Sequence, residues 1–459
     1  MAPVSREQML SGPIVKTLII LGGPVMASEL LQSLYSLVDT FWLGHLGPLE
    51  STHAVAALQI SWPIVFLLIA VSFGFGSAGI ALVSQYIGAG DQKEAESSAG
   101  QILLLSILFG LVIGLVGYLL SPLIVVGLGI QGDTVPAATI YLQIISLGMP
   151  FMCITMIFGF IIRATGDTVT PMKVEGVTVL INMVVDPLLI FGLLGLPRLG
   201  VMGAALATIF SQFIAAVIAL WILFSGRAGI RLHLSHLKPL MERIVQIFKI
   251  GIPASIGNSG TAFGFVILMG IIAQLPNQNI VLAAYGVANR ITDLLFIAIY
   301  GLEVGVSTMV GQCLGADNQK RAEEVARRGM AIMFIILLTA AAGLFLIREE
   351  IIHVFIANTE VVAEGANFIK IFVFGMAFFG IFRAVIATFV GSGHNIPTMI
   401  LEIIRLWGFR IPLVLLFGFF MGWETTGVWI ALAVSNVLSA VISLVLYKTD
   451  IWKEKVIKQ

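Results

Sequence analysis

The feature that most constrains this chain is an internal repeat. Val83-Ser84-Gln85-Tyr86-Ile87-Gly88-Ala89 returns as Val310-Gly311-Gln312-Cys313-Leu314-Gly315-Ala316, a shift of 227 residues (310 − 83). The same shift relates Gly148-Met149 to Gly375-Met376, Gly166 to Gly393, and Gly200-Val201 to Gly427-Val428. Four matches at one offset in a chain of 459 residues indicate two homologous halves.

Both halves are strongly apolar. Hydrophobic residues make up 58% of the chain and charged residues 11%, whereas a soluble domain has about 25% charged residues. A helix that crosses a bilayer needs about 20 mostly apolar residues. Twelve such runs are present, six in each half: 14–43, 53–83, 96–120, 135–162, 169–195, 201–224, 243–275, 280–311, 322–347, 359–389, 395–421 and 426–447.

The predicted fold class is therefore an all-α membrane protein with twelve transmembrane helices in two pseudo-symmetric six-helix lobes. The N-lobe covers residues 1–224, a cytoplasmic linker covers 225–242, and the C-lobe covers 243–459. Two apolar halves related by a repeat are typical of membrane transporters, in which a substrate path lies between the lobes.

Basic residues set the predicted orientation. They gather in the segments on the N-terminal side of the membrane, whereas the opposite loops contribute only Arg198 and Arg348. The positive-inside rule then predicts a multi-pass protein of the plasma membrane with both termini in the cytoplasm. On this same side, Gly88-Ala89-Gly90-Asp91 and Gly315-Ala316-Asp317-Asn318 are predicted to turn the chain and cap the next helix.

Several function classes are disfavoured. A formal net charge of zero argues against nucleic acid as a partner, and no phosphate-binding loop for ATP is present. We find no nucleophile–base set and no metal-ligand spacing, so an enzyme is not expected. The expected partners are the lipid bilayer and small organic substrates, and the chain is expected to act as a monomer.

The first apolar run carries a polar stripe. Glu29, Gln32, Ser36 and Asp39 follow 3-4-3 spacing and share one helix face, which Tyr35 flanks. Ionisable groups at membrane depth are costly, so such a stripe is expected to face a cavity or polar partners. Glu29, Gln32, Tyr35 and Ser36 are predicted to line a substrate cavity. Asp39 could instead cap the outer end of its helix. Glu29 could be a protonation site, a substrate contact or the partner of a cation on a neighbouring helix.

The fifth apolar run holds a second polar group. Asn182 and Asp186 are four residues apart, and Pro187 removes the amide that would bond the carbonyl of Met183. Oxygen donors of this kind suit Na⁺ or a proton with water, which makes Asp39, Asn182 and Asp186 the candidate ion ligands. Thr208 of the sixth run could add a hydroxyl. No cofactor beyond the ion is expected.

The second half carries other charges. Arg290 with Asp293, and Glu402 with Arg405, are three apart and are predicted to form structural pairs or contacts of a cytoplasmic gate. Glu303 and Lys370 have no evident partner nearby in the sequence.

The residues that carry a family resemblance lie along most of the chain. Pro24–Gly44 resembles the first helix of multidrug and toxic compound extrusion (MATE) transporters, supported by Ala164-Thr165-Gly166-Asp167, Val185-Asp186-Pro187-Leu188, Gly203-Ala204-Ala205 and Phe409-Arg410-Ile411-Pro412. The resemblance implies a V-shaped fold and export of organic, often cationic or amphipathic compounds in exchange for H⁺ or Na⁺.

The resemblance also implies roles for particular residues. Asp39, Asn182 and Asp186 coincide with the N-lobe cation site of the prokaryotic and archaeal DinF-like branch, and Thr208 plausibly joins them. Another bacterial branch uses carboxylates on the seventh helix, but Arg243–Gln274 contains no acidic residue, which favours coupling in the N-lobe. Glu29 stands where the family has an amide such as Asn.

Two alternatives remain at this stage. A lipid-linked oligosaccharide flippase of the same wider superfamily would share the helices and the repeat, but it would line its cavity with cations for the pyrophosphate. A passive channel would repeat the polar stripe in both halves, and the Asp39 stripe has no match near Leu268.

Overall fold

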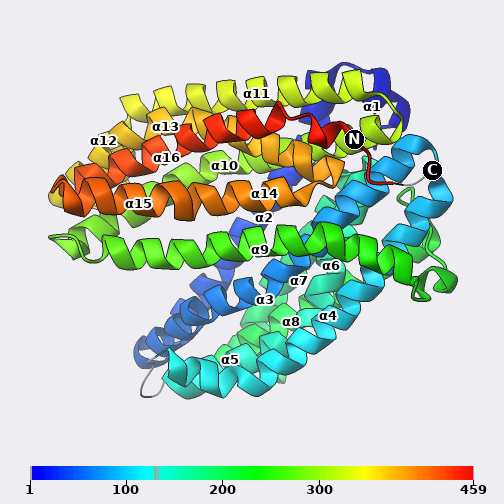
Figure 1. The fold of residues 1–459 in the computed structure, drawn as a ribbon. Coiled ribbons are helices and arrows are strands. Elements are labelled where there is room, and N and C mark those ends of the chain that lie inside the picture. Colours follow the sequence, from blue (N-terminus) through cyan, green and yellow to red (C-terminus); the bar gives the residue numbers. More distant parts are fainter. Residues whose placement is uncertain (1–2, 129–131, 133, 458–459) are drawn as a thin grey trace. The chain divides into compact units, whose positions relative to one another are not determined.

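The structure is a computed structural model that describes residues 3–128, 132 and 134–457, without the side chains of residues 48, 49, 52, 60 and 62. The described residues form helices and no strands (Figure 1). Eleven of these helices are long and apolar enough to cross a membrane, and the bent pair α5 and α6 makes a twelfth span if it is counted as one. The predicted all-α membrane fold is confirmed.

The chain divides into two compact units that interleave along the sequence. Unit 1 consists mainly of Pro24–Ile87 and Asp91–Ser255, and unit 2 of Val4–Gly23, Gly88–Gly90 and residues 256–457. Helix α2 begins in unit 2 and ends in unit 1, while α9 begins in unit 1 and ends in unit 2. The lobes expected from the repeat, residues 1–224 and 243–459, stay a prediction.

Unit 1 holds the end of α2 (Ile14–Gly44) and the start of α9 (Met241–Ile272). Between them lie α3 (Pro48–Ala89), α4 (Gln92–Gly127), α5 (Thr134–Leu147), α6 (Met149–Thr165), α7 (Val169–Phe191), η1 (Leu193–Gly195), α8 (Val201–Ser225) and η2 (Leu234–Leu237).

Unit 2 holds the rest of α2 and α9 together with α1 (Arg6–Ser11). Its other elements are α10 (Gln278–Gly315), α11 (Gln319–Leu346), α12 (Arg348–His353), α13 (Thr359–Ser392), α14 (Asn395–Ile403), η3 (Ile404–Arg410), α15 (Ile411–Val414), η4 (Leu415–Phe420), α16 (Glu424–Tyr447) and η5 (Ile451–Lys453). The η3 and η4 segments are π-helical.

The sequence repeat is also a repeat of local structure. Asp91 caps α4 and Asn318 caps α11, each through its side chain, as predicted. Gly166 ends α6 and Gly393 ends α13, both with left-handed backbone (φ +99° and +80°). A left-handed C-cap favours glycine because a Cβ would crowd the backbone there. The two halves therefore use the same helix ends.

The repeat register changes at the last helix of each half. The packing equivalent of Gly427 is Gly203, because a Cβ on either would overlap a backbone carbonyl, of Phe417 and Leu189 respectively. Gly200, which the sequence pairs with Gly427, has open space around it and precedes α8 as its N-cap. The connection before α8 is longer than the one before α16.

The fourth span is broken in the first half alone. Helices α5 and α6 meet at Gly148 with a bend of 52°, and Pro150 lies in the first turn of α6. Proline cannot donate the backbone hydrogen bond that would carry α5 onward. The residue that corresponds to Pro150 at the repeat offset of 227 is Ala377, and α13 continues through it without a break.

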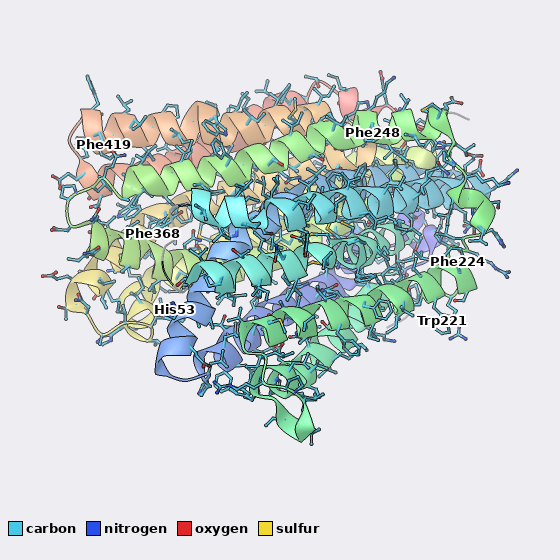
Figure 2. All side chains as sticks on the ribbon, turned by 90° about the horizontal axis from the view of Figure 1, so that it is seen from below. His53, Trp221, Phe224, Phe248, Phe368 and Phe419 are labelled. Atoms are coloured by element: carbon cyan, nitrogen blue, oxygen red, sulfur yellow. The ribbon has the colours of Figure 1, made fainter. Side chains whose placement is uncertain are left out.

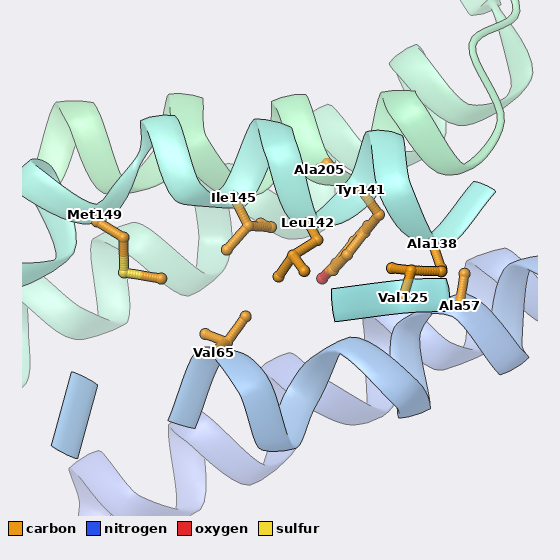
Figure 3. Close-up of a cluster of buried hydrophobic side chains, with 9 residues drawn as sticks. All are labelled: Ala57, Val65, Val125, Ala138, Tyr141, Leu142, Ile145, Met149 and Ala205. Atoms are coloured by element: carbon orange, nitrogen blue, oxygen red, sulfur yellow. The ribbon is translucent and has the colours of Figure 1, made fainter. Parts of the chain in front are cut away.

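Small and medium-sized side chains build the interior of unit 1. One cluster brings together five helices: Ala57 and Val65 of α3, Val125 of α4, Ala138, Tyr141, Leu142 and Ile145 of α5, Met149 of α6 and Ala205 of α8 (Figure 3). On the outer surfaces large apolar side chains are exposed, such as Trp221 of α8 and Phe419 of η4 (Figure 2). An exposed apolar surface of this kind suits contact with lipid.

Candidate functional site

Two buried carboxyls from different helices meet inside unit 1. Asp39 of α2 is 6% exposed and Asp186 of α7 is fully buried. Their side chains are close enough for one carboxyl, when protonated, to donate a hydrogen bond to the other. The Asn182 amide donates to Asp186 Oδ1 at 3.3 Å, one turn earlier on α7. The structure thus brings together the three residues predicted from spacing as ion ligands.

Four buried oxygen atoms of this site have no hydrogen-bond partner. They are Asp39 Oδ1, Asp186 Oδ2, Asn182 Oδ1 and the Thr208 hydroxyl of α8, all buried. No lysine or arginine of the described chain forms an ion pair with either aspartate. Buried polar atoms are normally paired, because an unpaired one loses its hydration without compensation. Four such oxygens in one place fit a proton or a hard cation as the missing partner.

Two tyrosines border the aspartate pair. The Tyr35 hydroxyl is buried and lies beside Thr208 and Ser211 of α8, without a hydrogen bond of standard geometry. Tyr141 of α5 lies within electrostatic range of both Asp39 and Asp186 and belongs to the apolar cluster of Figure 3. Sequence reasoning identified Tyr35 but missed Tyr141 and Ser211, whose helices carry no polar pattern that would single them out.

The donor set of this site consists of oxygen atoms from two carboxyls, one amide and one hydroxyl. Within the described residues no group of three or more His, Cys, Asp and Glu side chains could hold a metal. A pair of carboxyls with one amide and one hydroxyl oxygen is a hard donor set of low charge. Na⁺ and H⁺ with water both fit it.

The polar stripe of α2 divides between two surroundings. Glu29 lies within electrostatic range of Arg163, in the last turn of α6, and the exposed Gln32 lies beside Glu175 of α7. Ser36 is exposed. Glu29 therefore has a cationic neighbour on another helix, one of the alternatives left open for this residue. The substrate cavity of Glu29, Gln32, Tyr35 and Ser36 stays a prediction.

Arg163 and Glu175 were not predicted as partners. Arg163 falls directly after the apolar run 135–162, where a basic residue is also expected in a cytoplasmic loop. Glu175 lies seven residues into α7, and an acidic residue inside an apolar run was the available signal. Arg163 interacts electrostatically first with Glu175 and then with Glu29, which links α2, α6 and α7 at a second polar position of unit 1.

Unit 2 contains a larger ionic network. Arg383 of α13 pairs with both Glu303 of α10 and Glu402 of α14, and Glu402 also pairs with Arg405 of η3. The predicted Glu402–Arg405 pair is confirmed, and Glu303 acquires a partner 80 residues away. The network is built from equal numbers of acids and bases, unlike the aspartate pair of unit 1.

The other predicted pair of the second half is wrong. Asp293 accepts a hydrogen bond from Asn289 at 2.9 Å, and no ion pair with Arg290 occurs in the described part of the chain. Asn289 lies one turn before Asp293 on the same helix face, so its amide is the hydrogen-bond partner of this carboxylate.

Arg410 donates hydrogen bonds to two neutral partners, Ser435 Oγ at 3.0 Å and Asn436 Oδ1 at 2.6 Å.

These features define a class: a polytopic membrane protein made from a helical repeat, with ionisable groups buried inside each unit at membrane depth. The MatE family model matches residues 24–188 and 253–416, one segment in each half. The chain belongs to the MatE family, a family of transporters rather than enzymes.

Individual relatives extend over nearly the whole chain. It is 27% identical over 444 residues to "Probable multidrug resistance protein NorM" of Thermotoga maritima, covering 97% of this chain and 94% of that protein. It is 24% identical to "FAD transporter" of Shewanella oneidensis, covering 95% of each. Its fold matches "Crystal structure of MATE in the bent conformation" with a TM-score of 0.90 at 24% identity, covering 98% of both chains.

Proposed function

We propose that this transporter is a secondary active multidrug efflux antiporter that exports organic, often cationic or amphipathic compounds in exchange for H⁺ or Na⁺. The observation that carries the proposal is the buried Asp39–Asp186 pair, which has no basic partner in the described chain. One oxygen of each aspartate, the Asn182 amide oxygen and the Thr208 hydroxyl have no hydrogen-bond partner. A relative named as a multidrug resistance protein supports the substrate class.

The exchange follows from the charge of this pair. Two adjacent buried carboxylates without a cation are unfavourable, because neither their desolvation nor their mutual repulsion is offset. When an ion binds from outside, it neutralises the pair and weakens the attraction for a cationic substrate, which leaves. When the ion is released inside, the negative charge returns and the next substrate is attracted.

The electrochemical gradient supplies the energy. One charge that moves down a membrane potential of 100 mV releases about 2.3 kcal/mol. Because about 1.4 kcal/mol corresponds to a tenfold ratio, this supports a concentration ratio of about fiftyfold for each charge exchanged. The proposed orientation places both termini in the cytoplasm of a plasma-membrane protein that acts as a monomer.

Asp39, Asp186, Asn182 and Thr208 are the residues that would hold the ion. For Na⁺ they would supply two carboxylate oxygens, an amide oxygen and a hydroxyl. For H⁺ the proton would lie between the two carboxyls. This N-lobe assignment is the one implied by the DinF-like branch. No further cofactor is proposed.

The relatives are named for different substrates. The Shewanella oneidensis protein is named for an anionic dinucleotide, FAD, so overall likeness does not fix the charge of the substrate. In this chain the unbalanced charge of unit 1 is negative at the aspartate pair, which favours cations. The flippase alternative receives no support from the relatives' names.

Transport in liposomes tests the proposal. The purified protein is reconstituted with a fluorescent organic cation, and its movement is followed under an imposed pH gradient without Na⁺, and under a Na⁺ gradient at fixed pH. Asp39→Asn and Asp186→Asn should each abolish gradient-driven transport. Asp91→Asn is the matched control, because Asn caps the equivalent helix at Asn318. Undiminished gradient-driven transport in both site variants would exclude the pair as the coupling site.

A further inference from the structure

A pocket of about 380 Å³ lies at one end of unit 2, between α12 and the first turns of α13. Residues 359, 362, 363, 366, 367 and 370 line it, so a single face of α13 forms one wall. Arg348, Glu349 and His353 of α12 form the other. Helix α12 lies at the end of unit 2 opposite α1 (Figure 1).

Two cations, Lys370 and Arg348, line the pocket together with one carboxylate, Glu349. Lys370 is exposed and forms no hydrogen bond or ion pair with the described residues. Arg348 donates through Nη1 to the Phe345 carbonyl at 2.7 Å, while its Nη2 is 3.6 Å from Glu349 Oε1, longer than a hydrogen bond. The Glu349 side chain is 66% exposed, so it neutralises little of this charge.

Neutral polar groups accompany the two cations. Asn367 lies three residues before Lys370 on the lining face of α13, and Thr359 lies at the start of that helix. The side chains of both residues are without hydrogen bonds in the described chain. An amide, a hydroxyl, an ammonium and a guanidinium together offer donors to the oxygens of an anion.

Exposed apolar side chains lie next to the lining residues in the sequence. Leu346 and Ile347 precede α12 and are 75% and 48% exposed, and Val354 and Phe355 follow it at 80% and 58%. One turn beyond Lys370, Phe374 is 67% exposed and contacts the ring of Phe345 at 5.8 Å. The cations thus lie at the boundary between a polar helix end and an apolar surface, where the headgroups of a bilayer are found.

We propose that the α12–α13 pocket binds the phosphate-bearing headgroup of an anionic membrane phospholipid. Lys370 and Arg348 contact the phosphate, Asn367 and Thr359 contact headgroup hydroxyls, and the acyl chains lie along Phe374 and Leu346. A free phosphate ion would make the same polar contacts, but it would gain nothing from the apolar border.

Lipid binding to the purified protein tests this assignment. The melting temperature and the lipid adducts in native mass spectrometry are measured with phosphatidylglycerol, with phosphatidylcholine and with inorganic phosphate alone. Phosphatidylglycerol should stabilise the wild type most and phosphate alone should not. Lys370→Gln should weaken the phosphatidylglycerol effect about fivefold, the factor for about 1 kcal/mol per basic residue at an anionic surface.

Matched variants separate this pocket from general charge effects. Lys370→Arg should restore binding and Lys370→Glu should abolish it. Lys320→Gln removes one exposed charge near the start of α11 and should leave the effect intact. A photoactivatable phosphatidylglycerol should crosslink to peptides within residues 345–374.

Three results would overturn the proposal. Equal stabilisation by phosphatidylglycerol and phosphatidylcholine would remove the charge requirement. An unchanged effect in Lys370→Glu would place the lipid elsewhere. Full stabilisation by inorganic phosphate alone would show that the ligand is a free anion rather than a lipid.

Discussion

Arg383 of α13 and Glu303 of α10 form a bidentate ion pair inside unit 2. The guanidinium donates from Nε to Oε2 at 2.9 Å and from Nη2 to Oε1 at 2.7 Å. Its remaining nitrogen, Nη1, donates to Glu402 at 2.9 Å, and Glu402 accepts from Arg405 at 3.0 Å. Acids and bases therefore alternate across four elements, and each buried charge has an opposite neighbour.

Removing one member of this pair should be strongly destabilising. Glu303→Gln or Arg383→Gln leaves a buried charge without its main partner, at a cost of about 3–5 kcal/mol. The double variant should lose less than the sum, because no uncompensated charge remains. Thermal unfolding in detergent measures these differences. Glu50→Gln is the control, since its pair with Arg198 is more than half exposed and should contribute at most about 1 kcal/mol.

Asp39→Asn should make the protein more stable while it abolishes coupled transport. The substitution keeps the size of the side chain and removes a charge whose Oδ1 has no hydrogen-bond partner. A gain of about 1–3 kcal/mol is expected, because no buried charge without an opposite partner remains at this position. Melting temperatures across pH measure the gain. A loss of stability at every pH would contradict the view that the pair is an unsatisfied site.

Gly427→Ala should destabilise unit 2 through a backbone clash. A Cβ at this position of α16 would overlap the carbonyl of Phe417 and approach the amide of Gly418 at 2.9 Å. Neither group can move without shifting a helix, so a cost of about 1–3 kcal/mol is expected. Gly343→Ala is the matched variant, because a Cβ at this position of α11 meets nothing within 4 Å. It should be neutral or stabilise the helix by up to about 1 kcal/mol.

His394 should make the protein less stable in acid. The residue lies between α13 and α14, where burial lowers the pKa of its imidazole, opposed by the Glu454 carboxylate and a hydrogen bond to Ser392. As the pH falls below about 6.5, the unfolded chain takes up this proton more readily than the folded one, so stability decreases. His394→Gln should flatten the decline in melting temperature between pH 7.5 and 5. An equal decline in wild type and variant would exclude His394 as its source.

Much of this arrangement could be predicted from local patterns. The apolar runs predicted the membrane spans, because a helix needs about 20 mostly apolar residues to cross a bilayer. The 3-4 spacing on α2 and the i,i+4 spacing on α7 indicated Asp39, Asn182 and Asp186. An ionisable side chain is costly at membrane depth, so its presence there indicates a functional site. The contact between the two helices was a hypothesis that only the packing could decide.

Other parts depend on contacts that spacing cannot reveal. Arg383 and Glu303 are 80 residues apart and lie on different helices, so neither identifies the other. Arg163 lies in the last turn of α6. From the sequence, a basic residue at the end of an apolar run cannot be distinguished from one in the loop that follows. The bend at Gly148 was missed because Met149 and Pro150 lie within an unbroken apolar run, although a proline there was the available sign.

The interleaving of the units has a consequence for attempts to divide the chain into two halves. The opening turns of α2 belong to unit 2, and the opening turns of α9 belong to unit 1. A polypeptide severed near residue 240 would yield two fragments, each carrying a piece that the other requires. Each fragment would therefore lack helical turns that pack within its own unit, so we expect the two fragments to need one another to restore both units.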